Sequence, residues 1–125
     1  MIWQDFMFAC SMYPVNPEFI ESVRQEVDHQ VKRLHYHPSI VIWAANNENE
    51  AALRGNWYGT LLNYSRYAQD YVKLYVETIK RYVDAMDPSR ECLSSSPSNG
   101  KETESEGWIS KNPYSNIYGD GKTSE

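Results

Sequence analysis

A cluster of amide and carboxyl side chains follows directly on an apolar segment. Residues 40–45 read I-V-I-W-A-A, and residues 46–50 read N-N-E-N-E. A carboxylic acid that stands beside apolar side chains such as Trp43 is favoured in its protonated form, which is the form a general acid needs. The cluster therefore indicates a possible proton-transfer site, with Glu48 as the first candidate for the acid/base.

The same cluster also has a structural interpretation. Asparagine is a good helix N-cap, and glutamates in a first turn interact favourably with the helix dipole. Spacing alone favours this interpretation, because two glutamates separated by one residue do not face each other on a helix. Glu50 is accordingly expected to cap a helix or to support the site, and not to act as the catalytic partner of Glu48.

Two aromatic residues follow the cluster, and the histidines lie elsewhere. Trp57 and Tyr58 could stack on a sugar or could simply pack the connection, and the sequence does not decide between these roles. His29, His35 and His37 fall on or near the end of a predicted helix, away from the predicted strand tips. We expect them to be solvated and predict no metal site.

The cysteines and the glycines exclude further classes of site. Cys10 and Cys92 are too few for a disulfide scaffold or a metal cluster, and both are expected to be small buried thiols. The sequence contains no glycine-rich phosphate loop, and we expect no cofactor.

Length and composition bound the class of protein. The chain has 125 residues, of which 41% are hydrophobic and 23% charged, as in an ordinary single globular domain. Its net charge of −5 argues against a nucleic-acid-binding surface. No apolar run approaches the roughly 20 residues that span a bilayer, so no membrane partner is expected.

The cluster needs a scaffold, and the sequence predicts alternating strands and helices. Residues 2–9 and 40–45 have the composition of buried strands, and residues 92–95 predict a short third strand. Asn16 and Pro17 predict the start of a helix that runs to about residue 36. A polar connection over residues 46–63, with at most a short helix, leads to a second long helix at about residues 64–86, which Asp87 and Pro88 end.

Apolar residues at three- and four-residue spacing predict the buried face of each helix. In the first helix this face consists of Phe19, Ile20, Val23, Val27, Val31 and Leu34. In the second it consists of Val72, Tyr75, Val76, Ile79, Val83 and Met86, with Tyr71, Leu74 and Tyr82 on its flanks. Because the strand at residues 40–45 is apolar on consecutive residues, we expect both of its faces to be covered.

The order of the elements predicts right-handed parallel βαβ units. Parallel strands place their carboxyl ends at one edge, where sites in α/β proteins form. Gln4 and Asp5, the N-N-E cluster and residues 95–99 would meet at this edge. Two βαβ units leave two open sheet edges, so we expect a larger sheet or barrel, or a covering partner.

Four motifs together resemble the β-mannosidases of glycoside hydrolase family 2, and the animal lysosomal enzymes in particular. They are I-W-Q-D-F-M-F-A-C at residues 2–10, K-R-L-x-x-H-P-S-I-V-I-W at residues 32–43, N-N-E-N-E at residues 46–50 and S-S-P-S-N-G at residues 95–100. The resemblance runs from residue 2 to about residue 120. It implies a partial (β/α)8 TIM barrel, of which this chain would supply about strands three to five and two long helices.

The resemblance also implies roles for individual residues. The glutamate of the family's W-x-x-N-N-E motif is the general acid/base, which here is Glu48. Asn47 is expected to contact the sugar near its 2-hydroxyl group, and Trp3, Asp5 and Trp57 are expected to bind substrate. The implied reaction is retaining hydrolysis of terminal β-linked mannose from oligosaccharides, without a cofactor. Many family members have Ser-Gly where this chain has Ala44 and Ala45.

The family's nucleophile is a glutamate on a later strand, beyond the S-S-P-S-N-G segment. We therefore expect residues 1–120 to be a fragment of the catalytic domain, residues 121–125 to be a divergent tail, and the rest of the enzyme to be the partner. The isolated chain is expected to be inactive and, by resemblance, the enzyme to be lysosomal. The alternative is a truncated product that binds a glycan or a partner without catalysis.

Overall fold

The computed structural model describes residues 1–113, which are built around a three-stranded parallel sheet. Its strands are β1 (Ile2–Asp5), β2 (Ile40–Ala44) and β3 (Glu91–Leu93), in that order across the sheet. Trp3 pairs with Ile42, and Ala44 pairs with Leu93. The predicted parallel sheet and the alternation of strands with helices are confirmed. The predicted tail at residues 121–125 lies outside the described residues.

The first helix, α1 (Pro17–Leu34), begins where its sequence predicts. The Asn16 side chain accepts a hydrogen bond from the backbone N–H of Phe19 at 2.8 Å, and Pro17 takes the first helical position, where an N–H is not needed. The residues of the predicted apolar face are in the core or against it; those fully buried are Ile20, Val23, Val27 and Val31.

The second long helix changes its hydrogen-bonding pattern along its length. It consists of α3 (Tyr64–Tyr71), a π-helical segment η2 (Val72–Lys80) and α4 (Arg81–Met86). The predicted stripe is buried at Tyr75, Val76, Ile79 and Val83. A π turn holds more residues than an α turn, so the residues on the buried face differ from those that a regular helical period predicts. Tyr71 and Leu74, predicted as flanking residues, are buried, whereas Met86, predicted as a core residue, is 41% exposed.

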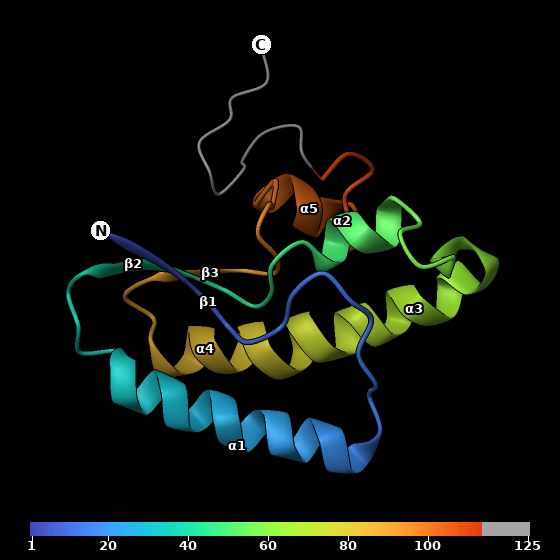
Figure 1. The fold of residues 1–125 in the computed structure, drawn as a ribbon. Coiled ribbons are helices and arrows are strands. Elements are labelled where there is room, and N and C mark those ends of the chain that lie inside the picture. The colour runs from blue at the N-terminus through green and yellow to red at the C-terminus, as the bar shows by residue number, and fades with distance from the viewer. Residues whose placement is uncertain (114–125) are drawn as a thin grey trace.

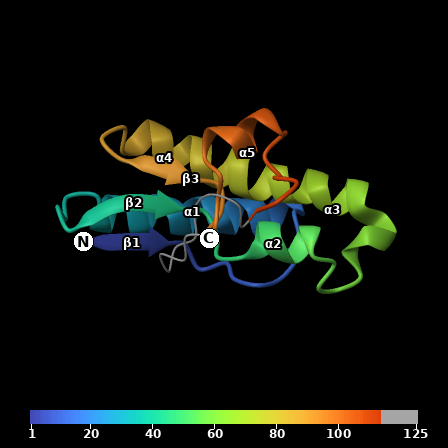
Figure 2. The same cartoon turned by 90° about the horizontal axis from the view of Figure 1, so that it is seen from above.

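Helices cover one face of the sheet. Figures 1 and 2 show α1 and α4 side by side beneath the strands, while α2 and α5 lie beyond the carboxyl ends of the strands. The prediction that both faces of β2 are covered holds for its carboxyl end, where the consecutive residues Trp43 and Ala44 are fully buried. It is wrong at Val41, which is 47% exposed.

A buried polar cluster joins the other end of the sheet to the helices. Trp43 donates from Nε1 to Oδ2 of Asp87 at 2.9 Å, and Arg90 forms an ion pair with Asp87 at 2.5 Å. Arg90 also donates to the carbonyl oxygens of Ile40 and His37, at 2.7 and 3.0 Å. Burial alone would raise the pKa of Asp87, but the hydrogen bonds that it accepts lower that pKa below its ordinary value.

Three short helices complete the described structure. They are α2 (Asn49–Arg54), the 3₁₀ helix η1 (Thr60–Asn63) and α5 (Lys101–Ser105). The helix α5 follows directly on the S-S-P-S-N-G segment. Within residues 1–113, no helix is both long enough and apolar enough to cross a membrane.

Candidate active site

The three strands continue as single hydrogen-bonded bridges at their carboxyl ends. Asn47 forms parallel bridges with Ala9 on one side and with Ser96 on the other. The backbone N–H of Asn47 donates to the carbonyl of Phe8 at 2.9 Å, and that of Glu48 donates to the carbonyl of Ser96 at 2.7 Å. Three strand ends therefore meet as predicted, with Asn47 and Glu48 in the central position. The first segment reaches this edge through Phe8 and Ala9, whereas Gln4 and Asp5, which were predicted there, pair with Trp43 and Ala44 further back in the sheet.

Glu48 lies on a sharp turn between β2 and α2. Its backbone has φ of 62° and ψ of 6°, the left-handed conformation that costs a non-glycine residue on the order of 1–3 kcal/mol. Glu48 occupies the N-cap position of α2, yet its side chain makes no capping hydrogen bond. Its half-buried carboxylate instead accepts a hydrogen bond from Sγ of Cys10 at 3.2 Å.

Asn46 caps the first turn of α2, the structural role that the sequence offered for the whole cluster. Its Oδ1 accepts from the backbone N–H of Asn49 at 3.0 Å and from Oγ of Ser95 at 2.8 Å, and its Nδ2 donates to the carbonyl of Ser94 at 2.8 Å. Asn46 is fully buried. The structural interpretation of the cluster thus holds for Asn46, which accepts the hydrogen bond from the first turn of α2.

Asn47 and Cys10 lie beside this carboxylate. Asn47 is half-buried, and its Nδ2 approaches Sγ of Cys10 at 3.8 Å. Cys10 was expected to be buried, but it is only half-buried, whereas Cys92 is buried as predicted. The hydrogen bond to Glu48 is the main cause that raises the pKa of the Cys10 thiol, so this group stays protonated and can donate.

Glu50 supports the cluster from inside the protein. It is completely buried, and its Oε1 accepts from the backbone N–H of Ser110 at 2.6 Å, which ties α2 to the loop after α5. Its Oε2 has no hydrogen-bond partner among residues 1–113. Burial raises the pKa of Glu50 to about 7, against the opposing effect of the Ser110 hydrogen bond. Glu50 therefore supports the cluster and does not cap α2.

Two of the predicted substrate-binding residues lie on β1. Trp3 and Asp5 lie on β1, half-buried, and Nε1 of Trp3 donates to Oδ1 of Asp5 at 3.0 Å. Burial is the main cause that raises the pKa of Asp5. The two side chains are therefore held together on the strand that neighbours the Glu48 strand.

The side chains of Trp57 and Tyr58 lie in different surroundings. Trp57 follows the C-cap of α2, at the opposite end of that helix from Glu48, and its exposed ring lies across Gly55. It lines an open groove together with Arg54, Leu61 and Lys111. The hydroxyl of Tyr58 instead donates to the carbonyl of Cys10 and so reaches the Glu48 neighbourhood.

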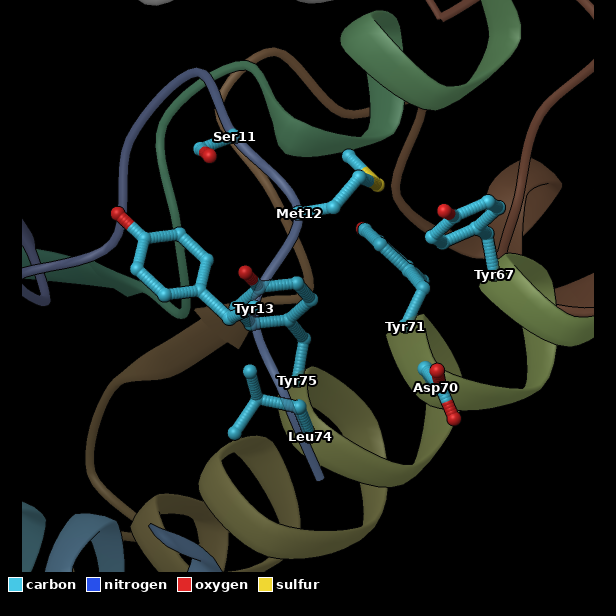
Figure 3. Close-up of a pocket in the computed structure, with 8 residues that line it drawn as sticks. All are labelled: Ser11, Met12, Tyr13, Tyr67, Asp70, Tyr71, Leu74 and Tyr75. Atoms are coloured by element: carbon cyan, nitrogen blue, oxygen red, sulfur yellow. The ribbon is translucent and has the colours of Figure 1, made fainter. Parts of the chain in front are cut away.

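A cavity between residues 11–13 and the second long helix is too small for a sugar. Its volume is about 10 Å³, room for about one water molecule. Figure 3 shows Tyr67, Tyr71 and Tyr75 projecting from the long helix toward the loop that carries Met12. Asn49 donates to the hydroxyl of Tyr75, so this aromatic cluster supports α2 from below.

The described residues offer no metal site. Within residues 1–113, no group of three or more histidine, cysteine or carboxylate side chains could hold a metal ion. His29, His35 and His37 are exposed, as the sequence predicted.

Sequence reasoning missed the loop that contacts the candidate acid/base. Cys10 and Tyr58 lie 38 and 10 residues away from Glu48 in the sequence. Cys10 was expected to be a buried thiol, and Tyr58 was left between sugar stacking and packing. The available signal was positional: a loop that leaves a parallel strand must pass the carboxyl end of the neighbouring strand.

Comparisons with known proteins agree on one family. The family described as "Glycosyl hydrolases family 2, TIM barrel domain" matches residues 2–125. A β-mannosidase of Rattus norvegicus is 56% identical over 121 residues, which are 96% of this chain and 14% of that protein. A probable β-mannosidase of Caenorhabditis elegans is 46% identical over 96% of this chain and 13% of its own length.

A solved structure also matches. The crystal structure of a β-D-mannosidase from Dictyoglomus thermophilum superimposes with a TM-score of 0.69 and 37% identity. The match covers 81% of this chain and 12% of that one. The three-stranded sheet is therefore part of a TIM barrel, as predicted. The chain spans about one seventh of the length of the rat β-mannosidase.

Proposed function

Because this chain belongs to glycosyl hydrolase family 2, as part of the TIM barrel domain, we propose that it contributes to the catalytic barrel of a retaining exo-β-mannosidase. The proposed substrate is a terminal β-linked mannose of an oligosaccharide. The activity is proposed for the complete enzyme, since the chain spans 14% of the rat relative. Residues 1–120 are the proposed barrel fragment, and residues 121–125 the proposed divergent tail.

The observation that supports a catalytic role for Glu48 is the position of its carboxylate. Glu48 stands where three strands end, on a left-handed turn, and its half-buried side chain does not cap the helix that follows. Asn46 has taken over the hydrogen bond to the helix N-terminus. A carboxylate that is held on a strained turn where three parallel strands end is suited to proton transfer.

In the proposed mechanism Glu48 acts twice. It first donates its proton to the glycosidic oxygen as the bond between that oxygen and the anomeric carbon breaks. It then removes a proton from the water that hydrolyses the glycosyl-enzyme, and so regains its starting state. Retention requires a second carboxylate about 5–5.5 Å from Glu48 to attack the anomeric carbon from the opposite face.

We propose that this nucleophile belongs to another part of the complete enzyme, so that residues 1–125 alone are inactive. The relevant partners are accordingly the rest of the enzyme and the β-mannoside itself. By family likeness we propose a lysosomal location.

Four residues are proposed to bind the sugar. Asn47 lies next to Glu48 in the sequence, is half-buried and has its amide beside the same thiol, which suits a contact with a hydroxyl of the bound mannose. The bonded pair of Trp3 and Asp5 on β1 offers an aromatic surface and a hydrogen-bond acceptor. Trp57 is exposed at the far end of α2, where it suits the leaving-group side of a longer substrate.

Kinetics of Glu48→Gln in the complete enzyme test the acid/base role. The variant is expected to lose about 10²–10⁴-fold in kcat/KM on an alkyl β-mannoside, whose leaving group needs protonation. The loss should be much smaller on a dinitrophenyl β-mannoside, whose leaving group departs without a proton. Equal losses on both substrates, or none on either, would remove Glu48 from this role.

A further inference from the structure

We propose that Cys10 is a positioning residue for Glu48, acting through its thiol, and that Tyr58 holds Cys10 in place for this task. The inference rests on the proposed acid/base role of Glu48 and adds two residues to it. Both residues act through Glu48 and not on the substrate.

The thiol of Cys10 contacts a carboxylate oxygen of Glu48. Sγ of Cys10 donates to Oε2 of Glu48 at 3.2 Å and lies 3.8 Å from Nδ2 of Asn47. A single small group therefore bridges the two side chains proposed for acid/base catalysis and sugar binding. Since a neutral S–H donor adds no charge, it can fix the direction of the carboxylate without forming a competing ion pair.

The loop around Cys10 is fixed to the Glu48 turn at successive residues. The backbone N–H of Asn47 donates to the carbonyl of Phe8, and that of Cys10 donates to the carbonyl of Asn47, both at 2.9 Å. The next backbone N–H, that of Ser11, donates to Oδ1 of Asn49 at 3.0 Å. The two segments are therefore in a defined register, and Cys10 is the residue that faces Glu48.

Cys10 itself has an unfavourable backbone conformation, with φ of 49°. Non-glycine residues with positive φ are uncommon and persist where the surroundings hold them. Tyr58 provides one of these contacts, because its hydroxyl donates to the carbonyl of Cys10 across 48 residues of sequence. The positive φ of Cys10 and the contact from Tyr58 both concern the Cys10 backbone, from which the thiol reaches Glu48.

The main alternative is that Cys10 only packs the loop. A packing role predicts that any residue of similar size is tolerated and that losses are the same for all substrates. A positioning role through a hydrogen bond predicts that a donor is needed, and that the need is greatest when Glu48 must deliver a proton. The two alternatives therefore separate in kinetics.

The test compares Cys10→Ala and Cys10→Ser in the complete enzyme, each on an alkyl and a dinitrophenyl β-mannoside. Cys10→Ala is expected to lose about tenfold in kcat/KM on the alkyl substrate, the factor for one hydrogen bond to a charged group, and about twofold or less on the dinitrophenyl substrate. Cys10→Ser keeps a donor and should recover most of the loss. The alkaline limb of the pH–rate profile should move in Cys10→Ala and return in Cys10→Ser.

Tyr58→Phe should show the pattern of Cys10→Ala in weaker form, because the hydrogen bond that holds the Cys10 carbonyl is removed while the thiol remains. Two variants serve as controls. Cys92→Ala removes the other thiol, which is buried in β3 away from Glu48, and Tyr36→Phe removes an exposed hydroxyl. Thermal melting of every variant separates lost folding from lost positioning.

The outcomes distinguish this inference from the proposed function. Wild-type kinetics in Cys10→Ala, or equal losses on both substrates with no recovery in Cys10→Ser, would overturn the positioning role. Glu48→Gln, assayed in the same series, tests the acid/base role itself. If Glu48→Gln loses activity and Cys10→Ala does not, only the inference about Cys10 fails.

Discussion

The buried carboxyl group of Glu50 allows the cost of ionising a buried acid to be measured. Its carboxyl group is completely buried, one oxygen accepts from the N–H of Ser110 at 2.6 Å, and the other has no hydrogen-bond partner among residues 1–113. Burial raises the pKa of Glu50 from 4.5 to about 7; the Ser110 hydrogen bond opposes this shift and the nearby charge of Glu106 adds to it. The folded structure therefore binds this proton more tightly than water-exposed Glu50 does.

The sign of the pH dependence follows from that shift. The stabilisation is complete below about pH 4.5 and is lost as the pH rises through about 7, because the buried group must then lose its proton. The difference of about 2.5 pKa units (7 − 4.5) corresponds to about 3 kcal/mol, or a factor of about 300 in the opening equilibrium. This magnitude applies to any opening that exposes the carboxyl group fully to water.

Hydrogen exchange of residues 106–113, which include the Ser110 amide, measures this opening in the complete enzyme. After correction for the intrinsic pH dependence of exchange, protection should fall by up to about 300-fold between about pH 4.5 and pH 8 in the wild type. In Glu50→Gln, which cannot ionise, protection should be nearly independent of pH.

Glu104→Gln is the matched control, because Glu104 lies on α5 and is exposed. It should keep the wild-type pH dependence. The reasoning is refuted if protection is flat in the wild type, or if it falls by the same factor in Glu50→Gln.

Three substitutions test the packing of the helices and the sheet. The quantity measured is the free energy of unfolding in urea, in the complete enzyme. Asn16→Ala removes the cap of α1 and should cost about 1 kcal/mol. Ile79→Ala leaves a cavity at a fully buried site and should cost about 2–5 kcal/mol. Arg90→Lys keeps the charge but loses the fork that reaches the Asp87 carboxylate and three backbone carbonyls, and should cost about 2 kcal/mol. Arg24→Ala, at an exposed position of α1, should change stability by less than about 0.5 kcal/mol, and similar costs at all four sites would contradict the packing described.

The parts of the fold that local chemistry determines could be predicted from the sequence. Asn16 and Pro17 locate the start of α1, because a cap and a preset φ act within one turn. Asp87 and Pro88 end the second long helix at Met86. Strands that alternate with helices are enough to predict a parallel sheet with its polar residues at one edge.

Features that depend on distant residues could not be predicted. Tyr71 and Leu74 are buried and Met86 is exposed, whereas a fixed helical period, which does not hold through the π-helical segment, predicts the opposite. Glu50 is buried by a loop 60 residues further along the chain. The contact between Cys10 and Glu48 likewise joins residues 38 positions apart.

The candidate site was predicted in part. The sequence indicated that Asn47 and Glu48 stand at the meeting of three strands, and the structure confirms this location. The spacing argument that set Glu50 apart from Glu48 agrees with their separate environments. The catalytic role of Glu48 and the substrate contacts of Asn47, Trp3, Asp5 and Trp57 stay predictions.

Chemical rescue of Glu48→Ala in the complete enzyme tests the central claim most directly. With a dinitrophenyl β-mannoside the glycosyl-enzyme should still form, but its hydrolysis should be slow because no base activates water. Azide needs no base, so it should restore turnover and give β-mannosyl azide, with the bond from the anomeric carbon to the nucleophile replaced by a bond to nitrogen. Glu48 is not the acid/base if the variant turns over like the wild type without azide, or if azide neither raises the rate nor appears in a β-configured product.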